Sequence, residues 1–194
     1  MIDIFKPSDF RLRPAEQTEA GLIRAHYDDV IERNNSLRAA DGTLRYIDWV
    51  YPFPLERVRV TVGQERLLVV EPEVQRERTR ILGRGAIDAT FITDTQPDPE
   101  IWHDVELPAN ALGFGKFAVR AALLGRGFGR TVAIPLLVAH ARETEASLLY
   151  CDALPHLDSY YISLGFEARG PGGFYSSHYQ KFVTVNRYTL DLDS

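Results

Sequence analysis

The sequence has 194 residues, a formal net charge of −5 at pH 7, and 45% hydrophobic against 25% charged residues. This composition predicts one soluble domain that spans residues 1–194, and its acidic balance argues against a nucleic-acid partner. No apolar run is long enough to cross a membrane, the first residues lack a basic signal-peptide head, and the single cysteine excludes an internal disulfide, so we expect a cytoplasmic protein.

The first half of the sequence predicts one helix and several strands. Residues 10–13 alternate between apolar and basic side chains up to Pro14, which predicts a short strand. Apolar residues recur at helical spacing over residues 16–32, which predicts a helix that ends near Asn34. Further strands are predicted at residues 58–62, 66–70 and 86–92, with a turn at residues 63–64.

A long loop and a more regular second half follow. Residues 94–110 contain three prolines and several acids, which predicts an exposed loop, and long loops often cover functional sites. Beyond it the pattern predicts strands at 115–119, 147–151, 166–168 and 179–190, with helices at 130–143 and 157–164. Gly165 is the expected C-cap of the second helix. This order of elements predicts a mixed α/β fold.

A glycine-rich loop separates the strand at 115–119 from the helix at 130–143. It reads Gly125-Arg126-Gly127-Phe128-Gly129-Arg130. Helix N-termini present unpaired N–H groups and a partial positive charge, so a loop of this kind favours phosphate binding, although glycine loops also serve as plain turns. Two nucleotide motifs are excluded: the Rossmann fingerprint would need glycine where Val132 stands, and no Gly-Lys-Ser/Thr follows as in a Walker A loop.

Two motifs together resemble the GNAT superfamily of N-acetyltransferases. Residues 117–130 are similar to its central motif, in which a Leu-Ala-Val type strand precedes Arg/Gln-x-x-Gly-x-Gly/Ala at the start of a helix. Leu124 occupies the Arg/Gln position and is a departure from the pattern. Residues 160–166, Tyr-Tyr-Ile-Ser-Leu-Gly-Phe, are similar to the family's second signature. The resemblance implies an α/β (α+β) fold with a mixed, mostly antiparallel sheet flanked by helices and with splayed central strands.

The resemblance also implies an activity and a site. An acetyl or other acyl group would pass from acyl-CoA, as co-substrate, to an amine of a small molecule or peptide. The expected cofactor-binding residues are Phe117, Val119, Leu124, Gly125, Arg126, Gly127, Phe128, Gly129, Arg130 and Thr131. Tyr161 matches the tyrosine that protonates the leaving thiolate in many members. The alternative for Tyr161 is a buried tyrosine packed beside the cofactor.

The general base is left open by the sequence. Four candidates are Asp152, His156, Glu106 and His103, and each side chain of this kind is more often a solvated surface group. The histidines show no paired spacing, so no metal is expected. Cys151 ends a predicted strand and is expected to be a small core residue rather than a nucleophile.

Acyl length and acceptor stay open as well. Residues 116–119 and 151–166 are somewhat similar to autoinducer and long-chain N-acyl amino acid synthases, which often use acyl carrier protein, but Gly113 stands where the former keep a catalytic Glu. The aromatic residues Tyr46, Trp49, Tyr51 and Phe53 suggest either an acceptor pocket or a small satellite core. A catalytically degenerate acyl-CoA-binding module and a homodimer are further alternatives.

Overall fold

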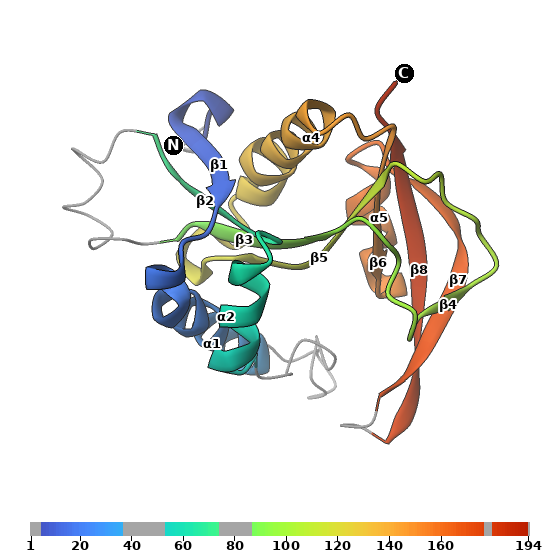
Figure 1. Cartoon of the computed structure of the whole chain (residues 1–194), viewed down its shortest axis with the longest axis horizontal. Helices are drawn as coiled ribbons and strands as arrows, with labels where there is room; N and C mark the ends of the chain where they lie inside the picture. Colours follow the sequence, from blue (N-terminus) through green and yellow to red (C-terminus); the bar gives the residue numbers. More distant parts are fainter. Residues whose placement is uncertain (1–4, 37–52, 74–86, 177–179, 194) are drawn as a thin grey trace. The chain divides into compact units, whose positions relative to one another are not determined.

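The computed structural model describes residues 5–36, 53–73, 87–176 and 180–193 (Figure 1). Its contacts divide the chain into two units, which we describe separately. Unit 1 comprises Met1–Ile92 and Lys116–Leu136, and unit 2 comprises Thr93–Gly115 and Leu137–Ser194. Strands pair in the order β1-β2-β3-β5-β6-β8-β7-β4, a mixed and mostly antiparallel sheet flanked by helices, which confirms the expected fold class.

Unit 1 contains an antiparallel sheet and two helices that lie side by side (Figure 1). The strands are β1 (Phe10–Pro14), β2 (Leu67–Pro72) and β3 (Ala89–Asp94), which ends just inside unit 2, and the helices are α1 (Ala20–Ser36) and α2 (Leu55–Gly63). Short 3-10 turns precede β1 at Pro7–Asp9, join β1 to α1 at Gln17–Glu19, and lie further along the chain at Ala121–Leu123. Ile23, Val58 and Leu67 are fully buried between helices and sheet, and burying each such side chain contributes about 1.5–3 kcal/mol.

The predicted strand at residues 58–62 is wrong, because these residues belong to α2. Their alternation of valine and polar residues is also compatible with a helix whose buried positions are three and four apart. Val58, Thr61 and Val62 are the buried residues of α2, and Pro54 stands at its N-cap. Packing of this face against α1 thus outweighs the β propensity of the valines.

Unit 2 contains four strands, the beginning of a fifth, the helix α5 and most of the helix α4. The strands are β4 (Trp102–His103), β6 (Leu148–Ala153), β7 (Glu167–Ser176), β8 (Lys181–Asp191) and the first residues of β5 (Ala111–Val119). The helices are α5 (Asp158–Ile162), a 3-10 turn at Pro155–Leu157, and most of α4 (Ile134–Glu143). The parallel pairing of β5 and β6 ends at Gly113–Tyr150, and both strands continue beyond it, as the expected divergence of the central strands requires.

The prediction of an exposed loop at residues 94–110 is partly wrong. Trp102 and His103 form the short strand β4, which pairs with Gly173 and Gly172 of β7. The side chain of His103 is only 2% exposed. Strand pairing with a segment some 70 residues later in the chain, rather than a local pattern, orders this part of the loop.

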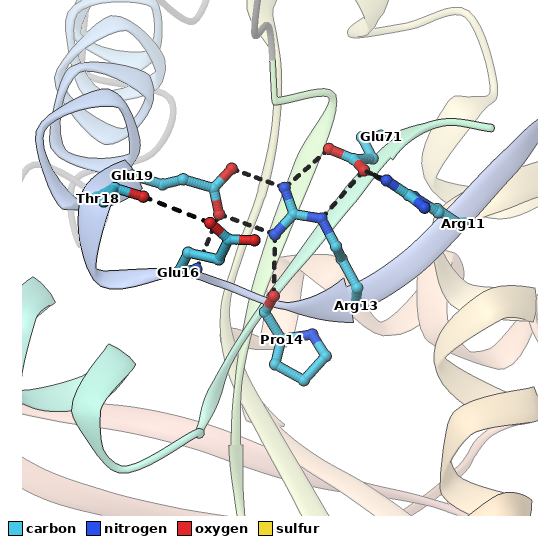
Figure 2. Close-up of polar contacts among 7 residues, drawn as sticks. All are labelled: Arg11, Arg13, Pro14, Glu16, Thr18, Glu19 and Glu71. Carbon is cyan, nitrogen blue, oxygen red and sulfur yellow. Dashed lines mark hydrogen bonds and ion pairs between the residues drawn. The ribbon is translucent and has the colours of Figure 1, made fainter. Parts of the chain in front are cut away.

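An ionic cluster joins the first strand of unit 1 to the start of α1 (Figure 2). The Arg13 guanidinium donates to both carboxylate oxygens of Glu19, at 2.8 and 2.6 Å, and to Glu71 on the neighbouring strand β2, at 3.0 and 2.9 Å. Hydrogen bonds from Arg13 hold the pKa of each of these two carboxyls below its usual value. Glu19 also caps its own helix turn by accepting from the backbone N–H of Glu16.

Candidate active site

The glycine loop of unit 1 lies between β5 and α4, as the sequence predicts. Gly125 and Gly127 adopt φ values of +73° and +80°, which side-chain-bearing residues adopt at a cost. A Cβ placed on either glycine would meet no atom of the described chain within 4 Å. These two glycines therefore serve the backbone conformation, and the space above them is open.

The helix after this loop begins with backbone N–H groups that lie ahead of its first internal hydrogen bond. Its first hydrogen bond runs from the Thr131 N–H to the Gly127 carbonyl, at 2.9 Å, and the Thr131 hydroxyl donates to the same oxygen at 3.0 Å. The amides of Gly127, Phe128 and Gly129 precede this bond, so they have no partner within the helix. The first turn, Gly129–Ala133, is a π-turn in which the Ile134 N–H reaches the Gly129 carbonyl. Such a helix start can accept an anion.

Side chains of the loop fall into two groups. Phe128 is fully buried and makes edge-to-face contacts with Phe10 and Phe5, at centroid distances of 5.0 and 5.4 Å, so it anchors the loop on unit 1. Arg126 and Arg130 are exposed, as is Leu124 at 37%. These two arginines carry the positive charge of the loop from Gly125 to Arg130, whereas Leu124 just before it is uncharged.

The strand β5 carries the two other predicted cofactor residues, Phe117 and Val119. Lys116 just before them has φ of +48°, a left-handed conformation that is uncommon for a residue with a side chain inside a strand. The Phe117 ring stacks on Phe91 of β3 at 4.6 Å with an interplanar angle of 4°. Val119 is buried at 9% exposure. The stacked ring of Phe117 attaches this part of β5 to β3 just before the glycine loop.

Tyr161, the predicted acid, belongs to α5 of unit 2 and is buried at 6% exposure. Its ring stacks on Tyr188 at 4.9 Å and meets Phe166 edge-to-face at 5.6 Å. Burial, reinforced by a hydrogen bond with the Cys151 thiol, raises the pKa of the Tyr161 hydroxyl well above its ordinary value. The hydroxyl is therefore protonated at neutral pH and can act as a proton donor. Cys151 itself is buried, as expected of a small core residue.

Unit 2 brings two of the four candidate bases together. His103 Nε2 lies 2.9 Å from Asp152 Oδ1, and Arg187 holds the same carboxylate through Nε at 2.9 Å and Nη2 at 2.8 Å. The side chains of His103, Asp152 and Arg187 are 2%, 10% and 3% exposed. We call these three residues the β4–β6–β8 cluster.

The environment of this cluster keeps His103 neutral. Burial lowers the pKa of its imidazole, and the Arg187 charge lowers it further, while the Asp152 carboxylate opposes both effects. The ring lies against the backbone of Gly172, where a Cβ would come within 2.2 Å of it. A neutral imidazole oriented by a carboxylate is the arrangement of a base and its orienting group.

The remaining candidates are less organised. Glu106 and His156 are both exposed, and neither belongs to the β4–β6–β8 cluster. Phe53 packs edge-to-face on Tyr27 at 5.0 Å in the core of unit 1, which favours the core interpretation for this residue. Tyr46, Trp49 and Tyr51 lie outside the described residues.

Sequence reasoning missed Arg187 and the pairing of His103 with Asp152. Arg187 lies in a predicted strand with no motif around it, opposite Asp152 in the β6–β8 register. The strand around Arg187 mixes polar and apolar residues, so nothing in the local sequence distinguishes this arginine. Among the described residues, no three His, Cys, Asp or Glu side chains gather as a metal site requires, and no helix is long and apolar enough to span a membrane.

The chain resembles known proteins in its structure and not detectably in its sequence. No family model and no curated protein matches the sequence. A GNAT-family acetyltransferase from Listeria monocytogenes matches with a TM-score of 0.67 at 17% identity, covering 94% of this chain and 94% of that one. A Salmonella typhimurium protein solved with its cofactor acetyl-CoA matches with a TM-score of 0.60 at 13% identity, covering 95% of each chain. A ribosomal-protein-alanine N-acetyltransferase from Brucella melitensis matches at 0.57 and 18% identity, over 93% and 98%. These likenesses show a shared fold.

Proposed function

We propose that this chain, which has the GNAT fold, is an acyl-CoA-dependent N-acyltransferase of that superfamily. The observation that carries the proposal is the helix start at Gly127 to Gly129, where backbone donors precede the first helical hydrogen bond and open space lies above the glycines. The fold likeness to acetyltransferases, one of them solved with acetyl-CoA, supports it. The pyrophosphate of CoA is the anion that this loop would hold.

Each of the predicted residues, taken within its own unit, then has a task. The loop amides bind the pyrophosphate, with Arg126 and Arg130 adding charge, and the backbone of Phe117 and Val119 binds the pantetheine arm. The acceptor nitrogen attacks the thioester carbon, the carbon–sulfur bond breaks, and the thiolate takes a proton from the Tyr161 hydroxyl. The high pKa of Tyr161 keeps its proton available until the thiolate forms.

The acceptor is proposed only as a class, an amine of a small molecule or peptide. It must lose a proton, and His103 is the candidate base that the structure orients best, through Asp152. Its side chain is only 2% exposed and packs against Gly172, so His103 is not proposed as the base. The proposals of a single domain over residues 1–194 and of a cytoplasmic location rest on the sequence.

A thiol-release assay with acetyl-CoA and longer acyl-CoAs, run against a panel of amines and peptides, tests the activity. We expect CoA release that depends on both substrates, and a loss of about a hundredfold in kcat for Tyr161→Phe. Tyr175→Phe is the matched control, because Tyr175 lies in the same unit with 62% of its surface exposed. Full turnover by Tyr161→Phe would remove the acid role.

The same assay separates a second candidate function. Leu124 in place of the usual Arg/Gln favours a module that binds acyl-CoA without using it. CoA binding without turnover for every amine and acyl length would support that module and contradict the enzyme. A chain that binds no CoA at all would contradict both.

A further inference from the structure

Two side chains of α1 hold the backbone of β5 just before the glycine loop. The Tyr27 hydroxyl donates to the carbonyl of Lys116 at 3.0 Å, and His26 Nε2 lies 3.3 Å from the carbonyl of Ala118. Both residues belong to unit 1 and are buried, at 2% and 7% exposure. Adjacent residues of one helix therefore contact alternate carbonyls of one strand.

The protonation of both side chains suits this contact. Burial lowers the pKa of His26 to about 4, so the imidazole is neutral at pH 7, and the carbonyl partner requires its proton on Nε2. Burial raises the pKa of Tyr27 above its ordinary value, so the hydroxyl keeps its proton. Both groups thus act as donors to carbonyls over the whole neutral range.

Peptide geometry links these contacts to the proposed cofactor site. The described chain has no cis peptide bond, and in a trans peptide the N–H points opposite to the carbonyl. When the carbonyls of Lys116 and Ala118 point to α1, the N–H groups of the next residues, Phe117 and Val119, point away from it. These are the two residues whose backbone is proposed to bind the pantetheine arm.

The two contacts from α1, which we call the brace of β5, hold a segment that contains a strained residue. Lys116 holds φ of +48°, a conformation that costs about 1–2 kcal/mol for a residue with a side chain and that persists only when its surroundings enforce it. Tyr27 bonds to the carbonyl of this strained residue. At the other end of the segment, the Arg120 N–H donates to the Asp88 carbonyl at 2.9 Å, and the two side chains form an ion pair at 2.7 Å.

We propose that Tyr27 and His26 are positioning residues for acyl-CoA, which fix two peptides of β5 so that the Phe117 and Val119 amides are presented to the cofactor. The inference rests on the proposed acyl-CoA site and deepens it. It states that two residues of α1 contribute to the affinity for acyl-CoA through the backbone of β5, without contacting the cofactor themselves.

Calorimetric titration of the full chain with CoA tests the brace. Tyr27→Phe keeps the ring that packs on Phe53 and removes only the hydroxyl, and we expect the Kd for CoA to rise about fivefold. His26→Leu should act similarly, whereas His26→Gln, whose amide can donate in place of Nε2, should restore most of the affinity. In turnover, the KM for acyl-CoA should rise with the KM for the amine unchanged.

Thr61→Val is the matched control, because it also removes a buried hydroxyl that donates to a backbone carbonyl, that of Arg57 within α2. It should lower the Tm as Tyr27→Phe does and leave the CoA affinity unchanged. If the wild-type chain binds CoA and Tyr27→Phe and His26→Leu bind it equally well, the inference is wrong while the proposed function stands. If folded wild-type chain does not bind CoA, the proposed function fails first.

Discussion

The two candidate centres of this protein are made of different chemical groups. In unit 1 the glycine loop offers backbone N–H donors at a helix start, and its side chains are exposed or serve as anchors. In unit 2 the β4–β6–β8 cluster consists of three nearly buried charged or titratable side chains. A backbone site tolerates a replacement such as Leu124, because the donors do not depend on that side chain. A side-chain cluster has no such tolerance, since Asp152 both neutralises the buried Arg187 and orients His103.

The largest effect on stability is expected when the carboxylate charge of the β4–β6–β8 cluster in unit 2 is removed. Asp152→Asn leaves the buried Arg187 without its carboxylate partner, and breaking a buried pair of this kind costs about 3–5 kcal/mol of unfolding free energy. Urea denaturation measures the loss. Asp104→Asn, at an exposed position of the same unit, is the control and should not change the midpoint. An equally stable Asp152→Asn would mean that the cluster is solvated.

A smaller effect is expected from pH in unit 1. The folded pKa of His26 is about 4, below the ordinary 6.5, so the unfolded chain binds the proton more readily. Neutral, buried His26 therefore contributes to the free energy of unfolding above pH 6.5. This contribution is lost as the pH falls, and the loss is on the order of 3 kcal/mol at pH 4. Asp29 opposes this shift and Arg120 adds to it.

His26→Gln removes this titration and isolates it from the carboxylates that titrate in the same range. Stability of the variant, measured by urea denaturation at several pH values, should fall less steeply between pH 6.5 and pH 4 than that of the wild type. Identical slopes for the two proteins would show that His26 is solvated, and the brace of β5 would lose its buried donor.

The smallest effect is expected at the ionic cluster of Figure 2, which is half-buried and involves no part of either centre. Arg13→Met removes the bonds to Glu19 and Glu71, and we expect a loss of about 1 kcal/mol that shrinks at high salt. Arg24→Met, which breaks only the exposed pair with Asp28, should cost a few tenths of that. Salt-independent losses would show that packing of the Arg13 stem dominates.

The sequence alone predicts the glycine loop as a candidate site. For the β4–β6–β8 cluster it names two of the three residues but does not bring them together. A strand, glycines and a helix in succession are a local pattern, so the loop from Gly125 to Arg130 could be placed without the fold. His103 and Asp152 appeared as separate candidates, because the contact between them depends on β4 pairing with β7. Arg187 joins them through the register of β6 and β8, which no local pattern encodes.

The same limit explains the error at residues 58–62. Alternating valines favour a strand by local propensity, yet Val58 and Val62 are buried together on one helix face. The choice between these periods is made by packing against α1, which is remote in sequence. Local chemistry could also not reveal that Tyr27 and His26 contact a strand some 90 residues away.

Titration of the wild-type chain with CoA, beside Gly127→Val and Gly170→Val, tests the central claim most directly. Both glycines have positive φ and open space around the missing Cβ, so valine strains the backbone at either position, but only Gly127 belongs to the loop. We predict that wild type and Gly170→Val bind alike and that Gly127→Val, folded by circular dichroism, binds about a hundredfold more weakly or not at all. Wild-type affinity in Gly127→Val would contradict the account.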